Sequence, residues 1–187
     1  VIADMPFLTH NVTEADAVRN SGRFLSEGGA AAVKVEGGAE IAGIVAGMVR
    51  RGIPVLGHIG MTPQHVHRMG GYKLQGRNPA DSKRILADAV ALEKAGAFAI
   101  VLELVTEEAA AAVTRKVTVP TIGIGAGRRV DAQILVFHDL VGLNPDFSPK
   151  FLKRYAELGK EAAGAVRKFA SDVSRGAFPG EENVFHN

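Results

Sequence analysis

Short apolar runs alternate along the chain with longer stretches in which apolar residues recur at helical spacing. The short runs are typical of strands buried on both faces, and the periodic stretches are typical of amphipathic helices. This alternation predicts a parallel sheet covered by helices. Strands are expected at residues 1–7, 31–36, 53–56, 97–105, 120–124 and 134–137, and helices over about 13–27, 39–51, 78–96, 106–116 and from 148 beyond 166.

Several helix starts carry a capping sequence. Thr13 and Asp16 have the spacing of a capping box, Asn78 or Asp81 precedes a helical pattern, and Thr106 precedes another. The long C-terminal helix is expected to open at residues 148–149, and residues 62–63 to open a short helical segment after the strand at 53–56. Residues from 176 onward are expected to be irregular.

Polar residues fall at the expected carboxyl ends of the strands, and they decide between two α/β folds. Asp4, Glu36, His58, Glu103 and His138 all lie there, together with the glycine-rich residues 123–127. A closed (β/α)₈ TIM barrel collects residues from many strand ends on one catalytic face, whereas an open doubly wound sheet uses a few strands at its switch point. We therefore expect residues 1–187 to form a single barrel domain.

A complete barrel has eight βα units and about 250 residues, and this chain shows six. We therefore expect the first two units to be absent, because residues 1–7 already resemble a strand and Val1 is not an initiating methionine. On this prediction the chain is the C-terminal part of a barrel.

Composition narrows the chemistry and the setting. The chain has 187 residues, 47% of them hydrophobic, and no cysteine, which excludes disulfides, zinc ribbons and thiol nucleophiles. No run is apolar enough to span a membrane and no signal peptide is evident, so a cytoplasmic protein that binds no membrane is expected. The net charge is +2 without a basic cluster, so no nucleic-acid partner is expected.

Asp4, Glu36 and His58 could form a set of ligands for Mg²⁺, which prefers oxygen donors. Either carboxylate alone could instead be a loop cap or an ion-pair partner. Strand alternation places Lys34 on the same face as Glu36. Lys34 could bind a substrate carboxylate, form a Schiff base or neutralise Glu36, and the two acids favour a charged binding group over a Schiff base.

Glu103 is the one charged residue in the apolar run 97–105. A carboxylate that loses hydration there becomes a better proton acceptor, which suits a general base, although a strand-end glutamate could also face solvent. His58 and His138 could be structural or catalytic, and His10, His65 and His67 are expected at the surface. The glycines at 123–127 lack the spacing of a dinucleotide-binding loop.

Motifs spread over essentially the whole chain resemble the ketopantoate hydroxymethyltransferase family. They are VIADMPF, AVKVEGG, GHIGMTPQ, GGYKLQGR, VLELV, VPTIGIGAG and QILVFHDLVGL. The resemblance implies a (β/α)₈ barrel of the phosphoenolpyruvate/pyruvate type in a homodecamer. It also implies transfer of a hydroxymethyl group from 5,10-methylenetetrahydrofolate to 3-methyl-2-oxobutanoate, through a Mg²⁺-stabilised enolate, giving ketopantoate for pantothenate and coenzyme A synthesis.

Matching motifs imply roles for individual residues. By resemblance, Asp4 binds Mg²⁺ and substrate, Glu36 binds the metal, Lys34 and His58 contact the substrate, and Glu103 accepts the proton. The family also has an upstream Gly-Asp-Ser strand that supplies a metal ligand, and this chain contains no such strand. Two alternatives remain open, a Mg²⁺-dependent lyase or mutase acting on a small 2-oxo acid, and a non-catalytic barrel fragment.

Overall fold

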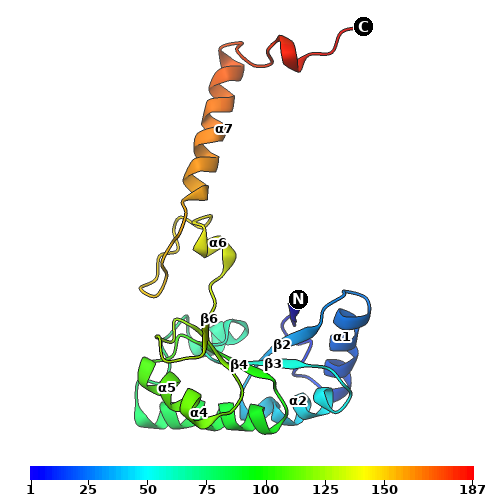
Figure 1. The fold of residues 1–187 in the computed structure, drawn as a ribbon, viewed down its shortest axis with the longest axis vertical. Coiled ribbons are helices and arrows are strands. Elements are labelled where there is room, and N and C mark those ends of the chain that lie inside the picture. The colour runs from blue at the N-terminus through cyan, green and yellow to red at the C-terminus, as the bar shows by residue number, and fades with distance from the viewer. The chain divides into compact units, whose positions relative to one another are not determined.

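The computed structural model describes all of residues 1–187 and divides them into two units, residues 1–134 and residues 135–187. The first unit contains the parallel sheet that the sequence predicts. Each strand pairs in parallel with the next strand of the chain, so the order across the sheet equals the order in sequence (Figure 1). The strands are β1 (Ile2–Asp4), β2 (Ala32–Glu36), β3 (Val55–Gly60), β4 (Ala99–Glu103), β5 (Thr121–Ile124) and β6 (Ala132–Gln133).

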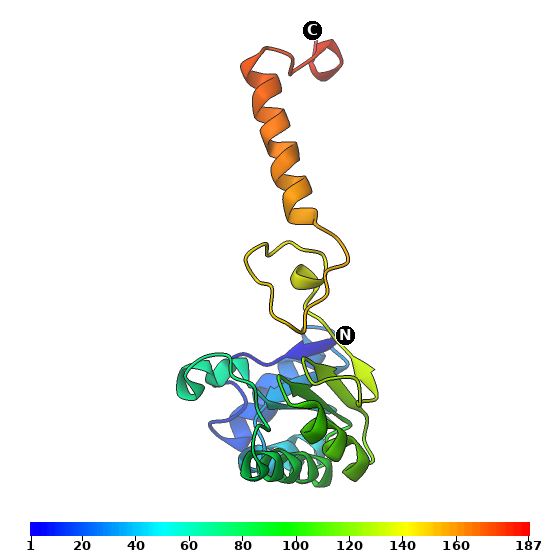
Figure 2. The ribbon, with the colours of Figure 1, turned by 90° about the vertical axis from the view of Figure 1, so that its left-hand side faces the viewer.

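The four longer helices of this unit cover one face of the sheet (Figures 1 and 2). They are α1 (Glu14–Ser26), α2 (Ala42–Val49), α4 (Pro79–Lys94) and α5 (Glu107–Lys116). A doubly wound sheet reverses its strand order and carries helices on both faces, and this sheet does neither. The architecture is therefore a curled, singly wound α/β sheet, with β1 and β6 at its two edges.

The main hydrophobic core lies between the sheet and these helices. Alternate residues of each strand point toward the helices, as the two-residue period requires. Gly57 also faces this side, because a Cβ there would lie 2.8 Å from Leu92 of α4. The strand residues of this core include Val33, Val35, Val55, Ile59, Ile100 and Leu102, and the helices contribute Ala17, Val45, Met48, Ile85, Ala89, Leu92, Ala110 and Val113.

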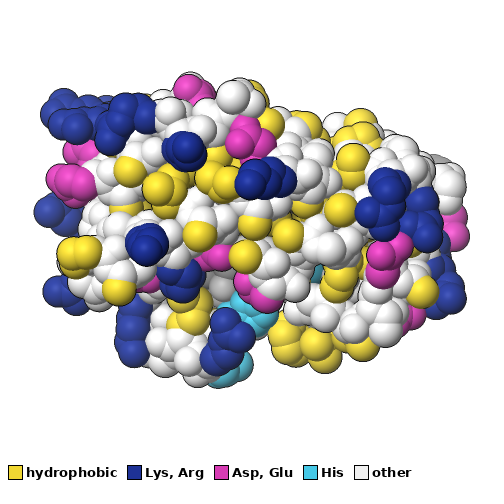
Figure 3. Space-filling model, turned by 90° about the horizontal axis from the view of Figure 1, so that it is seen from below, with side chains coloured by type: hydrophobic (Ala, Val, Ile, Leu, Met, Phe, Trp, Pro, Cys, Tyr) yellow, Lys and Arg dark blue, Asp and Glu magenta, His cyan; other side chains and the backbone are white.

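Figure 3 shows the molecule from the side on which α2 and α4 lie at the bottom of Figure 1. Lys and Arg side chains are scattered over this face among Asp and Glu, and hydrophobic side chains appear between them in small groups. The face is that of a solvated helical layer, whose buried stripe is turned toward the sheet.

The opposite, concave face of the sheet is divided into two layers. A smaller hydrophobic cluster joins Leu56, Ala99 and Val101 with the partly buried Ile122 and Ile124. The polar residues of the same face lie further along the strands, toward their carboxyl ends. We call the apolar cluster the floor of the concave face, because the polar layer is built directly beyond it.

The strand β3 extends further than the sequence predicts. It runs over Val55–Gly60 rather than residues 53–56, because parallel pairing with its neighbours continues past Leu56. Glu36 pairs in register with His58, and Gly60 with Glu103. His58 therefore lies inside a strand with neighbours on both sides, and the predicted strand end was wrong.

Thr13, Asn78 and Thr106 all occupy the N-cap positions of their helices as predicted, but only the first two form a side-chain capping bond. The side chains of Thr13 and Asn78 accept hydrogen bonds from the N–H groups of Asp16 and Asp81, three residues later. Thr106 makes no such bond, because its Oγ1 donates to the carbonyl of Gly76 instead. Short helical segments follow the strand ends: η1 (Ala39–Ile41), η2 (Pro63–His65) and α3 (Val66–Met69).

The second unit contains α6 (Phe137–Leu140), α7 (Leu158–Ser174) and η3 (Glu181–Asn183). The strand predicted at 134–137 is wrong, since sheet pairing ends with the short β6 and α6 begins at Phe137. The last long helix begins at Leu158 rather than at residue 148. Arg154 donates to the carbonyls of Asn144, Pro145 and Phe147, which holds the preceding segment as a loop.

The helices of both units are too short or too polar to serve as a membrane-crossing segment.

The carboxylate of Asp131 ties the start of β5 to the segment before β6, and this contact makes stability depend on pH. Its Oδ2 accepts hydrogen bonds of 2.8 Å from the backbone N–H and the hydroxyl of Thr121. These bonds, the backbone bond first, lower the pKa of Asp131 despite the opposing effect of desolvation. The ionised side chain therefore stabilises the folded state above its unfolded pKa, and this stabilisation is lost as the pH falls through the lower, folded pKa.

We expect Asp131→Ala to reduce the free energy of unfolding by about 1 kcal/mol at neutral pH, because two charge-assisted bonds at an exposed site are lost. Chemical denaturation is measured from neutral pH down into strong acid. The free energies of unfolding of the variant and the unsubstituted protein should converge at the acidic end of this range. There the Asp131 carboxyl group is protonated in both the folded and the unfolded state. A difference of constant size across the range would contradict the assignment.

Candidate active site

Five of the residues that the sequence singles out meet on the concave face. Asp4 ends β1, Lys34 and Glu36 lie two apart on β2, His58 lies in β3 and Glu103 ends β4. Adjacent strands are in register, so Asp4 faces Lys34 across one pair and Glu36 faces His58 across the next. The parallel sheet therefore brings the backbones that carry these side chains together on one face.

Lys34 is the hub of the contacts among them. Its Nζ lies 2.8 Å from Oδ1 of Asp4, 3.8 Å from Oε1 of Glu36 and 3.3 Å from Nδ1 of His58. An ammonium group can only donate hydrogen bonds. The Lys34 side chain is therefore held as a charged group by both carboxylates, as its position beside two acids predicts.

His58 connects this hub to Glu103. Its side chain is 3% exposed, and Nδ1 must accept the bond from the Lys34 ammonium. In the neutral ring the proton is then on Nε2, which lies 3.2 Å from Oε2 of Glu103 without the alignment of a hydrogen bond. His58 Nε2 and the Glu103 carboxylate are therefore close neighbours that are not hydrogen-bonded in this structure.

The charges of this cluster do not balance. Three carboxylates, those of Asp4, Glu36 and Glu103, surround one ammonium group and one imidazole. Asp4 is the most exposed member, with a side chain 59% accessible, whereas Glu36 is 3% accessible. Excess negative charge at a partly open position favours a cation from solvent.

The carboxylates of Asp4 and Glu36 are available to bind such a cation, and they do not form a complete coordination shell. The structure contains no group of three or more acidic or histidine side chains arranged to hold a metal ion. His58 as a third ligand is not supported, because its Nδ1 contacts Lys34. Asp4 and Glu36 alone fit Mg²⁺, which commonly binds one or two protein carboxylates and keeps several waters.

Glu103 is followed by a residue in an unusual backbone conformation. Leu104 has φ of +47°, a region that leucine rarely occupies. Its N–H donates to the carbonyl of Ile124 in β5, and its carbonyl accepts from the N–H of Gln75. Neighbouring segments therefore hold the turn that follows Glu103. A strained backbone conformation persists only where the surrounding structure stabilises it in this way.

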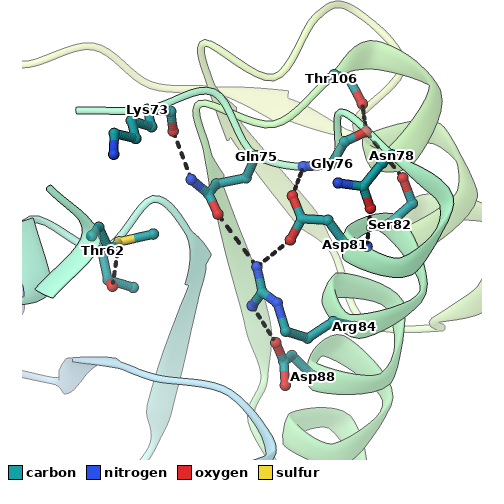
Figure 4. A network of polar contacts seen from close by, with 11 residues as sticks. Thr62, Lys73, Gln75, Gly76, Asn78, Asp81, Ser82, Arg84, Asp88 and Thr106 are labelled. Carbon is teal, nitrogen blue, oxygen red and sulfur yellow. Dashed lines mark hydrogen bonds and ion pairs between the residues drawn. The ribbon is translucent and has the colours of Figure 1, made fainter. Parts of the chain in front are cut away.

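The glycine-rich segment 70–78 is hydrogen-bonded to this turn, since the Gln75 N–H donates to the carbonyl of Leu104 and the Gln75 carbonyl accepts from the N–H of Thr106. Figure 4 shows its polar network: Gly76 accepts from Thr106 and Ser82 through its carbonyl, and its N–H donates to Asp81. Arg84 joins Gln75 to two acids of α4, Asp81 and Asp88. Burial raises the pKa of Asp88, while the Ala39 N–H bond and Arg84 act in the opposite direction.

The structure adds two residues that sequence patterns did not assign to the site. Gln64, in η2, donates its N–H to Oε2 of Glu36 and its side-chain amide to the carbonyl of Met5. His10, predicted at the surface, is only 1% exposed, and its Nε2 bonds the carbonyl of Glu36 at 3.1 Å. The Thr-Pro pair before Gln64 predicts the short helix, but not its contact with β2.

His138 is exposed and belongs to the second unit. In the glycine-rich segment, Gly123 lies in β5, and a Cβ there would lie 2.9 Å from Val130 in the segment before β6. His65 is partly buried against Thr62, and His67 is exposed. The prediction that His65 lies at the surface is therefore only partly correct.

Two cavities of the first unit lie outside the cluster. One, of about 140 Å³, is next to the ends of β2 and β3 and is lined by Gly38, Glu40, Gly60, His65, Arg84 and Asp88 among others. The other, of about 420 Å³, lies beside α1 and is lined by residues including Pro6, Asn20, Arg23 and Phe24.

Comparison with known proteins assigns the sequence to a family. Residues 1–181 match the family model described as ketopantoate hydroxymethyltransferase. The 3-methyl-2-oxobutanoate hydroxymethyltransferase of Kosmotoga olearia is 56% identical over 187 residues, which are 100% of this chain and 70% of the relative. An enzyme of the same name from Thermus thermophilus is 52% identical over 99% of this chain and 70% of its own length.

Solved structures of lower similarity share the fold. A putative phosphonomutase from Burkholderia cenocepacia has a TM-score of 0.54 at 13% identity and covers 94% of this chain and 68% of its own. A putative lyase/mutase from the same organism has a TM-score of 0.51 at 17% identity, over 93% of this chain and 61% of its own. At these identities the likeness concerns the arrangement of strands and helices alone.

Gly60 allows the close approach of β3 and β4 at Glu103. It has φ of +92°, and a Cβ there would contact the carbonyl oxygen of Glu103 and lie 2.6 Å from Val105. We expect Gly60→Ala to lower the free energy of unfolding by more than about 2 kcal/mol in denaturant titrations, because backbone strain adds to a steric clash.

Gly52→Ala is the matched control. Gly52 has φ of +81° and open space around the position of a Cβ, so alanine there should cost only the backbone term, about 1 kcal/mol. Equal losses for the two variants would show that the strand contact at Glu103 is not as tight as the structure places it.

Proposed function

The chain belongs to the ketopantoate hydroxymethyltransferase family, and on that premise we propose how the clustered residues of the concave face divide the reaction among themselves. The activity is the transfer of a hydroxymethyl group to 3-methyl-2-oxobutanoate, which gives ketopantoate for the synthesis of pantothenate. A folate compound is the one-carbon donor, and we propose that it is 5,10-methylenetetrahydrofolate. The lyase or mutase alternative rests on the fold alone, and the family match favours the transferase.

The assignment of roles rests on one observation. Lys34, His58 and three carboxylates contact one another on the concave face of the sheet. A 2-oxo acid is an anion with two adjacent oxygen functions. Asp4 and Glu36 would hold Mg²⁺, which when bound supplies a Lewis acid for the ketone oxygen. Asp4, more exposed than Glu36, also borders the space that substrate enters.

Lys34 would bind the substrate carboxylate. Its ammonium already contacts Asp4 and Glu36 at 2.8 and 3.8 Å, so it lies beside both proposed metal ligands and offers the positive charge that the substrate anion needs. Three donors on one nitrogen allow it to retain a carboxylate contact while binding the substrate. A Schiff base is disfavoured, because both carboxylates contact the Lys34 nitrogen as ion-pair partners.

Glu103 would remove the proton from C3 of the oxo acid. The resulting enolate would form a carbon–carbon bond to the methylene carbon as one of the two bonds between that carbon and the folate nitrogens breaks. Water would then replace the second nitrogen, which gives the hydroxymethyl group of the product and releases tetrahydrofolate. The Nε2 of His58 lies 3.2 Å from Glu103 and would hold this carboxylate in place while contacting the substrate. The floor formed by Leu56, Ala99 and Val101 offers an apolar surface for the isopropyl carbons.

The larger assembly is also a proposal. The strand order 1 to 6 and the unpaired edges β1 and β6 support an eight-stranded barrel of the phosphoenolpyruvate/pyruvate type, completed by two further βα units. The relatives are longer than this chain, which spans 70% of the first of them. We further propose a homodecamer in the cytoplasm, as in the family that the motifs resemble.

Replacing the proposed base tests the function directly. We expect Glu103→Gln to reduce exchange of the C3 proton of 3-methyl-2-oxobutanoate into D₂O by about 100-fold or more, because an amide cannot accept the proton. The exchange is followed by NMR with Mg²⁺ and without folate, on this chain and on one extended to the length of its relatives. Substrate affinity, measured by calorimetry, should change little.

Glu108→Gln is the control, since Glu108 is an exposed residue of the same segment in the first turn of α5. Exchange that survives in Glu103→Gln would assign the base to another residue. Loss of substrate binding in that variant would place Glu103 in the substrate pocket rather than in proton transfer.

Removal of the metal tests the roles of Asp4 and Glu36. We expect EDTA to abolish C3 exchange and Mg²⁺ to restore it, whereas Asp4→Asn should require much higher Mg²⁺ for the same rate, since a ligand charge is lost. Exchange that continues at full rate after dialysis against EDTA would exclude a metal from the proton-transfer step.

A further inference from the structure

The separation of the two proposed metal ligands depends on a residue that belongs to neither of their strands. Asp4 and Glu36 come from β1 and β2, and the direct contact that they share is the ammonium of Lys34. A flexible lysine side chain does not fix the distance between two carboxylates. A second and more rigid connection therefore determines where Glu36 lies relative to the end of β1.

That connection is Gln64. Its backbone N–H donates a 2.9 Å hydrogen bond to Oε2 of Glu36, and its side-chain Nε2 donates a 2.7 Å bond to the carbonyl of Met5, the residue after Asp4. The orientation of the amide follows from the chemistry, because a carbonyl can only accept. One residue thus bonds the Glu36 carboxylate at one end and the main chain beside Asp4 at the other.

The surrounding structure supports this bridge. Met5 is fully buried, and its N–H bonds the carbonyl of Lys34, so the carbonyl that Gln64 contacts belongs to an ordered part of the chain. His10, 1% exposed, bonds the carbonyl of Glu36 and fixes the backbone from which that side chain projects. Glu36 is therefore held through its carboxylate by Gln64 and through its main chain by His10.

We infer that Gln64 is a positioning residue for metal binding, which sets the separation of Asp4 and Glu36 by joining the Glu36 carboxylate to the main chain at Met5. The inference rests on the proposed roles of Asp4 and Glu36 as ligands of Mg²⁺. Groups that orient metal ligands commonly change metal affinity by about 10 to 100-fold when they are removed. The hydrogen bonds of Gln64 go to Glu36 and Met5, so its proposed effect on the metal passes through them.

The test measures metal affinity instead of turnover. Gln64→Leu keeps most of the side-chain volume and Gln64→Ala does not, while both remove the donor to Met5 and retain the backbone N–H. The dissociation constant for Mn²⁺ is measured by electron paramagnetic resonance with saturating 3-methyl-2-oxobutanoate. We expect it to rise about tenfold in both variants.

Gln133→Ala is the matched control. Gln133 also donates its side-chain amide to a main-chain carbonyl, that of Gly127, at 2.8 Å. Thermal unfolding should show a similar small loss of stability for this variant, with its Mn²⁺ dissociation constant within about twofold of the unsubstituted protein. If Gln64 contributed only to stability, its two variants would likewise keep the Mn²⁺ dissociation constant of the unsubstituted protein.

The outcomes separate this inference from the proposed function. Unchanged Mn²⁺ affinity in Gln64→Leu and Gln64→Ala, with binding by the unsubstituted protein intact, overturns the role of Gln64 alone. If the unsubstituted protein, extended to the length of its relatives, binds no Mn²⁺, both the metal assignment and the inference are overturned. A tenfold loss in the two Gln64 variants but not in Gln133→Ala supports the inference.

Discussion

The register of three adjacent strands is the constraint on which the candidate site depends. Pairing of Glu36 with His58 and of Gly60 with Glu103 places the acidic groups and the imidazole on one face, at successive levels along neighbouring strands. A shift of β3 by one residue would turn His58 toward the helices and Leu56 with it. The hydrophobic floor and the polar layer are thus fixed by the same hydrogen bonds, and neither could be rearranged independently of the other.

Much of the fold could be predicted from the sequence, because the apolar periodicity of this chain is regular. Five of the strands, the helices between them and the caps at Thr13 and Asn78 follow from local patterns. The failures have non-local causes. β3 extends to Gly60 because partners lie on both of its sides, and the stretch after β6 is not a strand because its pairing to β5 ends there.

Part of the candidate site could also be predicted from the sequence. Asp4, Lys34, Glu36 and Glu103 could be identified from the sequence as charged residues in or at the ends of buried strands. Burying a charge costs free energy, so charged residues there are expected to have partners or a function. The partners of these residues could not be predicted from spacing. Gln64 and His10 form hydrogen bonds to Glu36 although they lie 28 and 26 residues away in sequence. The Thr106 side chain bonds the carbonyl of Gly76, which is 30 residues away, instead of an N–H group of its own helix. Such contacts depend on how loops fold over the strand ends, which periodicity does not encode.

The sequential strand order also bears on how the chain reaches this structure. Every strand pairs with the one made just before it, so each pairing joins segments that are close in sequence. Contacts of short sequence separation form fast, and domains assemble progressively as they leave the ribosome. Lys34, Glu36 and His58 can therefore come together before Glu103 has been synthesised, and the proposed proton acceptor is the last of the five residues to arrive.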